Sequence, residues 1–141
     1  MLELKGCYYY PEQCFFICKV ASLFLLSSIN AGYKGHYDLA IGPFGIFLTS
    51  LNYWRKPVPN SWRRYLDMTC VSFVLSYQLI RAYNAEYYKE HYLAVVIGLS
   101  FYPLGNYFYK KKQYWNSIYS HSMIHVMANV SHFILCSGTL F

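Results

Sequence analysis

The chain has 141 residues, of which 56% are hydrophobic and 13% are charged, with a net charge of +6. A soluble domain usually carries about 25% charged residues, so this composition argues against an ordinary soluble fold. The basic residues form no patch interleaved with aromatic side chains, and we therefore expect no nucleic acid partner.

Five apolar stretches follow one another, and most approach the roughly 17–25 residues that cross a bilayer as a helix. They are residues 14–30, 39–54, 66–81, 92–109 and 114–136. The first is not expected to be a cleaved signal peptide, because Glu3 and Glu12 precede it and no small-residue cleavage site follows. The second is short and is broken by Gly42, Pro43 and Gly45. Together they predict an all-α, polytopic membrane helix bundle of about five transmembrane helices. Residues 1–141 would form this single domain, with membrane lipids as its partners.

Basic residues are distributed unevenly around these segments. If five helices alternate in direction, nine Lys and Arg residues fall on the N-terminal side of the bundle and three on the opposite side. The first set is Lys5, Lys19, Arg55, Lys56, Arg63, Arg64, Lys110, Lys111 and Lys112, and the second is Lys34, Arg81 and Lys89. The positive-inside rule then predicts a cytoplasmic N-terminus and a non-cytoplasmic C-terminus. The sequence specifies neither which membrane this is nor an oligomeric state.

Three histidines share one face of the last predicted helix. At about 100° per residue, His125 lies roughly 40° from His121, and His132 about 20° from His125, with Asn129 beside them. Polar residues in a membrane helix usually face the bundle interior and mark a functional site. They can also simply hydrogen-bond neighbouring helices together, and both interpretations stay open at this stage.

The spacing of these histidines suggests a metal site. Histidines four residues apart on a helix can bind one metal ion, so His121 and His125 are candidate ligands. His132 lies about 10 Å further along the axis and is expected to be packed or hydrogen-bonded. A catalytic zinc ion usually has three protein ligands. Asp67 is the candidate third ligand, because a carboxylate in an apolar segment needs a cation or a hydrogen-bonding partner. The topology places Ser50 at the same depth as these residues, near the cytoplasmic face.

Three short motifs resemble the CREST superfamily, which includes alkaline ceramidases, hemolysin III proteins and the progestin and adipoQ receptors. TSLNYW (49–54) is similar to the family's Ser-x-x-x-His at the end of the second helix. WRRYLDM (62–68) is similar to the Asp motif that opens the third helix, and SHSMIH (120–125) to the His-x-x-x-His of the last helix. The resemblance implies a zinc ion with an activated water. The chain departs from the family in having room for about five helices rather than seven. It also has Trp54, which cannot bind zinc, in place of the family's histidine.

Two functional hypotheses follow. In the first, the protein is a zinc-dependent hydrolase of lipid amides or esters, in which His121 and His125 bind zinc. Asp67 would then be the third ligand or the base, and Ser50 would donate a hydrogen bond to the developing oxyanion. In the second, the protein is a non-enzymatic membrane scaffold, receptor-like or membrane-remodelling protein with a degenerate metal site. Haem is a third alternative, and it is disfavoured because axial histidines would have to come from facing helices.

Overall fold

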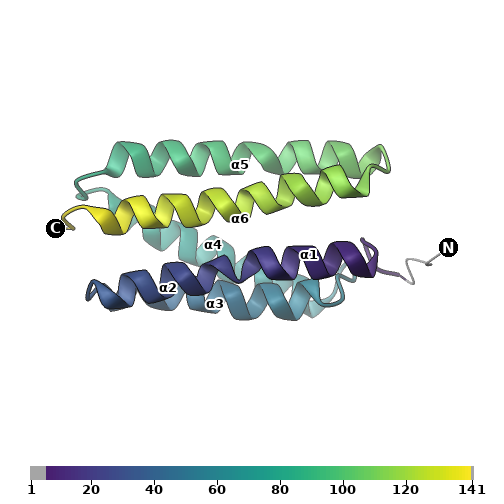
Figure 1. Cartoon of the computed structure of the whole chain (residues 1–141), viewed down its shortest axis with the longest axis horizontal. Coiled ribbons are helices and arrows are strands. Elements are labelled where there is room, and N and C mark those ends of the chain that lie inside the picture. Colours follow the sequence, from purple (N-terminus) through teal and green to yellow (C-terminus); the bar gives the residue numbers. More distant parts are fainter. Residues whose placement is uncertain (1–5, 141) are drawn as a thin grey trace.

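The computed structural model describes residues 6–140, in which every regular element is an α-helix. The helices are α1 (Pro11–Ala21), α2 (Leu23–Tyr33), α3 (Tyr37–Trp54), α4 (Trp62–Ala82), α5 (Tyr88–Lys110) and α6 (Tyr114–Ser137). The predicted all-α fold is confirmed. Because α1 and α2 continue one another across Ser22, the chain runs along the bundle five times (Figure 1). Each of the five apolar stretches lies within one of these five passes.

Local sequence explains where several helices begin. Pro11 occupies the first turn of α1, where its missing N–H costs nothing, and the Gln13 side chain accepts a hydrogen bond from the Tyr10 N–H at 3.0 Å. Ser61 precedes α4, and its Oγ accepts a hydrogen bond from the Arg64 N–H at 3.4 Å. These contacts satisfy donors that a helix N-terminus leaves without an intrahelical partner.

The glycines and the proline of the second stretch do not interrupt the helix, since α3 runs without a break from Tyr37 to Trp54. Pro43 has no N–H to donate to the Leu39 carbonyl one turn earlier. That carbonyl instead accepts a hydrogen bond from Nε2 of His132 on α6, at 2.8 Å. A side chain from a neighbouring helix therefore repairs the backbone where proline has removed a hydrogen bond.

The helices pack unevenly around the bundle. The most extensive contact is between α5 and α6, where Gly98 lies so close to α6 that a Cβ on it would be 2.9 Å from the Met127 Cβ. Small residues of this kind let helix backbones approach one another. By contrast, α4 packs mainly on α3 and contacts α5 only sparsely. Figure 1 shows α4 behind the layer formed by the other helices.

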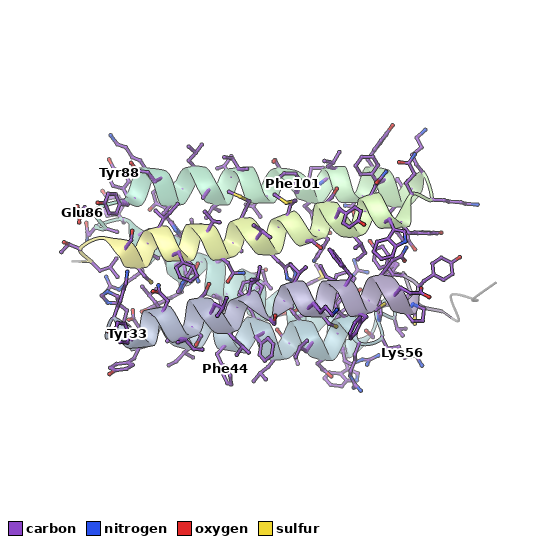
Figure 2. All side chains as sticks on the ribbon, in the orientation of Figure 1. Tyr33, Phe44, Lys56, Glu86, Tyr88 and Phe101 are labelled. Atoms are coloured by element: carbon purple, nitrogen blue, oxygen red, sulfur yellow. The ribbon has the colours of Figure 1, made fainter. Side chains whose placement is uncertain are left out.

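The two ends of the bundle differ in charge. The connections 55–61 and 111–113 lie at the end where α1 begins, which we call the basic end because Arg55, Lys56 and Lys110–Lys112 cluster there. Figure 2 shows Lys56 at this end and Glu86 at the opposite one. This agrees with the alternation assumed for the sequence-based orientation. Lys5, which entered that orientation, and Glu3, which entered the argument against a signal peptide, lie outside the described residues.

Within residues 6–140, one helix is long and apolar enough to cross a membrane by length and composition alone. It is Pro11–Tyr33, near the N-terminus, with a mean hydropathy of 1.8 over its most apolar window. A signal sequence, or the core helix of a soluble protein, meets the same criteria of length and composition. Tyr, Ser, Asn and His recur in the other helices and lower their mean hydropathy. Five membrane crossings therefore remain a prediction.

Candidate functional site

A cavity of about 270 Å³ lies inside the bundle between α3, α4, α5 and α6. All four residues singled out from the sequence, Ser50, Asp67, His121 and His125, line it. Most of the remaining lining is aliphatic or aromatic and comes from all four helices, with Phe24 contributed by α2. The cavity is thus a largely apolar space with a polar group of residues on its wall, a composition typical of small-molecule sites.

Asp67 on α4 is held by two hydroxyl groups from α3. Thr49 Oγ1 donates a hydrogen bond to its Oδ1 at 2.9 Å, and Ser50 Oγ donates to the same oxygen at 3.0 Å. The carboxylate therefore has the hydrogen-bonding partners that its apolar segment requires. Because its hydroxyl hydrogen is already engaged, Ser50 would have to leave Asp67 before it could donate to an oxyanion.

Thr49 was not among the residues selected from the sequence. It precedes Ser50 directly in the TSLNYW stretch. Its role depends on α3 and α4 packing so that two adjacent hydroxyls reach one carboxylate oxygen. The signal that could have found it is the need of Asp67 for more than one donor at that depth.

His121 and His125 lie one turn apart on α6, and their ring centroids are 5.0 Å apart. His125 is buried and packs edge-on against the Phe24 ring at 5.3 Å. Its Nδ1 has no hydrogen-bond partner among residues 6–140. A buried ring nitrogen without a partner is costly. This nitrogen could bind a metal ion or accept a hydrogen bond. Asn129 has a different role, because its Nδ2 donates to the His125 carbonyl and its Oδ1 accepts from the Ser27 hydroxyl.

Trp54 at the end of α3 lies directly against His121, with 4.7 Å between the ring centroids. It is 4% exposed, and its indole Nε1 has no hydrogen-bond partner within the part of the chain that the structure describes. The second pass of the chain therefore reaches His121, at the position where the resemblance places a histidine. An indole can pack against the imidazole there but supplies no metal ligand.

His132 also lines the cavity, but both of its ring nitrogens have partners. Nε2 donates to the Leu39 carbonyl, and Nδ1 lies 3.9 Å from the Cys136 sulfur. This agrees with the prediction of a packed, hydrogen-bonded histidine. His91 on α5 is also buried, and its Nδ1 lies 2.8 Å from the Ser131 carbonyl oxygen.

A complete metal-ligand group is not assembled in the described part of the chain. Between residues 6 and 140, no cluster of three or more His, Cys, Asp or Glu side chains could hold a metal ion. The two histidines of the predicted zinc site are adjacent, and the unpaired Nδ1 of His125 fits a ligand role. Asp67 is on the wall of the same cavity, with its Oδ1 bound to Thr49 and Ser50.

Comparisons of this chain with protein-family models, with curated proteins and with solved structures gave no match. The similarity to the CREST superfamily therefore rests on the three motifs alone.

Proposed function

We propose that this protein is an integral membrane protein whose five helical passes cross the bilayer. The support is the distribution of its side chains, which combines a strongly apolar surface with many buried polar residues. Large apolar residues face outward along every pass, among them Phe15, Ile29, Ile41, Phe44, Phe73, Ile80, Leu93 and Val96. Figure 2 shows Phe44 directed away from the bundle. Such a surface is unfavourable in water and favourable in lipid.

The interior contains many polar residues beside its apolar core. Its buried polar residues include Ser27, Ser50, Gln78, His91, Ser117, Ser120, Ser122, His125, Asn129, Ser131 and His132. Several of them join helices, as the Ser27 hydroxyl does with Asn129 and His132 with the Leu39 carbonyl. Polar residues that face the interior and bond between helices are characteristic of membrane bundles.

The orientation can be tested with reporter tags at both ends of the chain. Because basic residues cluster at the end where α1 begins, we expect the N-terminal tag in the cytoplasm and the C-terminal tag on the other side. Two tags on the same side would contradict five crossings. Recovery of the protein in the soluble fraction of cells lysed without detergent would contradict membrane insertion altogether.

Within this bundle, we propose that the cavity is the active site of a zinc-dependent hydrolase of lipid amides or esters. The observation that carries this proposal is that Ser50, Asp67, His121 and His125 line one largely apolar cavity. His121 and His125 would hold the ion, with Asp67 as the third ligand or as the base. When bound, zinc supplies a Lewis acid that polarises a carbonyl group and makes water more acidic.

The chain's own residues have separable tasks in this proposal. Thr49 and Ser50 fix one oxygen of Asp67, which orients the carboxylate toward the cavity as an acceptor for the proton of an attacking water. The apolar walls would receive the hydrocarbon part of a lipid. Met68 on α4 and Leu99 on α5 line the cavity and are also about half exposed, at 47% and 51%. A lipid would therefore approach between α4 and α5, where helix contact is sparse.

Hydrolysis can be measured on the purified protein with fluorescent ceramide-like amides and matching esters. We expect release of the labelled fatty acid, inhibition by a zinc chelator, and a loss of about 100-fold or more in Asp67→Asn, the lower range for removing a positioned base. Asp38→Asn is the matched control, because Asp38 lies at the opposite end of the bundle in an ion pair with Arg81. Zinc-loaded, folded protein without activity on either lipid class would argue against the hydrolase.

A non-enzymatic membrane protein is the second candidate. Two observations favour it. The Trp54 indole packs on His121 at the position where the resemblance places a histidine, and residues 6–140 contain no assembled group of three ligands. The histidines would then hold helices together, as His125 does through Phe24. Zinc binding without turnover, or no zinc binding, would support this alternative.

A further inference from the structure

Residues Tyr8–Tyr10 precede α1 and lie across the basic end of the bundle. The Tyr8 N–H donates to the Pro57 carbonyl at 2.9 Å in the α3–α4 connection. Its hydroxyl accepts a hydrogen bond from Arg64 Nη1 at 2.6 Å, and the guanidinium lies 5.3 Å from the Tyr8 ring centroid. The same ring packs edge-on against Tyr109 at 5.6 Å. One tyrosine thus attaches this segment to the start of α4, to the end of α5 and to the loop between α3 and α4.

Tyr9 attaches the segment to the interior. Its hydroxyl lies 2.8 Å from Ser117 Oγ, whose own hydrogen is donated to the Gly105 carbonyl at 2.9 Å. The Tyr9 hydroxyl is therefore the donor of this pair. Its ring centroid is 5.6 Å from that of Trp54 and 5.5 Å from that of Tyr109. Tyr9 accordingly contacts side chains at the ends of three helices, α3, α5 and α6.

A row of ring contacts, which we call the stack although its rings are tilted against one another, leads to the candidate site. Tyr9 packs on Trp54, Trp54 lies 4.7 Å from His121, and His121 lies 5.0 Å from His125. Trp54 does not line the cavity, whereas both histidines do. Tyr9 and Trp54 therefore lie between His121 on the cavity wall and the basic end of the bundle.

We propose that Tyr8, Tyr9 and Trp54 form a plug that closes the cavity toward the cytoplasm. This rests on the membrane orientation proposed above, which makes the basic end water-facing, and does not depend on zinc or on hydrolysis. Tyr8 anchors the plug, Tyr9 covers Trp54, and Trp54 covers His121. With that end closed, the side between α4 and α5 is the cavity's route to its surroundings. Displacement of the N-terminal segment would admit water to His121.

The intrinsic fluorescence of Trp54 provides a direct test. Replacing the two outward-facing tryptophans, Trp62→Phe and Trp115→Phe, leaves Trp54 as the only indole of the chain. Quenching by acrylamide, a water-soluble quencher, then reports whether water reaches Trp54 in the protein reconstituted in nanodiscs. We expect weak quenching in this parent chain and a several-fold larger quenching constant in Tyr9→Ala. Tyr10→Ala is the matched control, because its ring packs on Tyr114 rather than on Trp54.

A second variant guards against simple unfolding of Tyr9→Ala. Arg64→Ala removes the hydrogen bond and the cation contact that hold Tyr8 but leaves every ring of the stack in place. It should raise quenching to an intermediate level, with the helix content by circular dichroism unchanged. Strong quenching in the parent chain would overturn the proposal. So would equal quenching constants in the parent, Tyr9→Ala and Arg64→Ala chains. Neither result bears on zinc binding, and the terminal tags test the orientation separately.

Discussion

Loss of bound zinc is the expected result of replacing either His121 or His125 by alanine. The two rings are adjacent on α6, and the buried Nδ1 of His125 has no other partner in residues 6–140. A zinc ion held by three protein ligands cannot keep its affinity with one imidazole removed. The measurement is zinc content per chain, by atomic emission, of each variant purified in the same detergent.

His132→Ala is the matched control, since His132 lies on the same helix and the same cavity but has both ring nitrogens occupied. It should retain its zinc. It should also be less stable by about 1–3 kcal/mol, because the Leu39 carbonyl left free by Pro43 would lose its donor. Equal loss of zinc from all three variants would contradict a single site formed by His121 and His125.

Asp67→Asn should lower zinc affinity as strongly as the loss of a histidine. The amide keeps the size of the side chain and can still accept hydrogen bonds from Thr49 and Ser50, but it lacks the negative charge that attracts a cation. Mutation of a residue that only orients a metal ligand typically lowers metal affinity by about 10–100-fold. A decrease beyond that range, measured by competition with a zinc-binding dye, would identify Asp67 as a ligand. No decrease would leave it a structural carboxylate.

Trp54→His should act in the opposite direction and strengthen zinc binding. The Trp54 ring lies 4.7 Å from that of His121, so an imidazole on α3 would be placed beside the existing pair. Trp54→Phe is its control, since it also removes the indole but adds no ligand. If Trp54→His binds zinc no more tightly than Trp54→Phe, α3 does not contribute to the metal site, and the similarity of TSLNYW to the family motif loses its meaning.

The positions of the helices could be predicted because they depend on local composition. Apolar stretches bounded by loops with Pro, Gly and charged residues fall within the five passes, and Pro11 and Ser61 mark two of the starts. The meeting of Ser50, Asp67, His121 and His125 at one cavity could also be anticipated. Alternating passes bring the end of one helix and the start of the next to the same depth. The 3.6-residue period then places His121 and His125 on one face of their helix.

Other features were beyond sequence reasoning because they depend on contacts between distant segments. The effect of Pro43 on α3 is offset by His132, some 90 residues later. The sequence predicted a short span over residues 39–54 but gave no sign of this contact. Likewise, the packing of Tyr9 on Trp54 requires both the N-terminal segment and the end of α3 to be in place. The contacts of His132 with Leu39 and of Tyr9 with Trp54 join residues too far apart in the sequence for helical periodicity to predict them.

The central claim is that the cavity of this helix bundle holds a metal ion through His121 and His125. Its most direct test is the zinc content of the unmodified protein, extracted from membranes with mild detergent and purified without chelators. We expect about one zinc ion per chain, a stoichiometry set by the single pair of candidate histidine ligands and the three-ligand rule for catalytic zinc. Protein that is helical and folded, yet free of zinc even after incubation with the metal, would contradict the account.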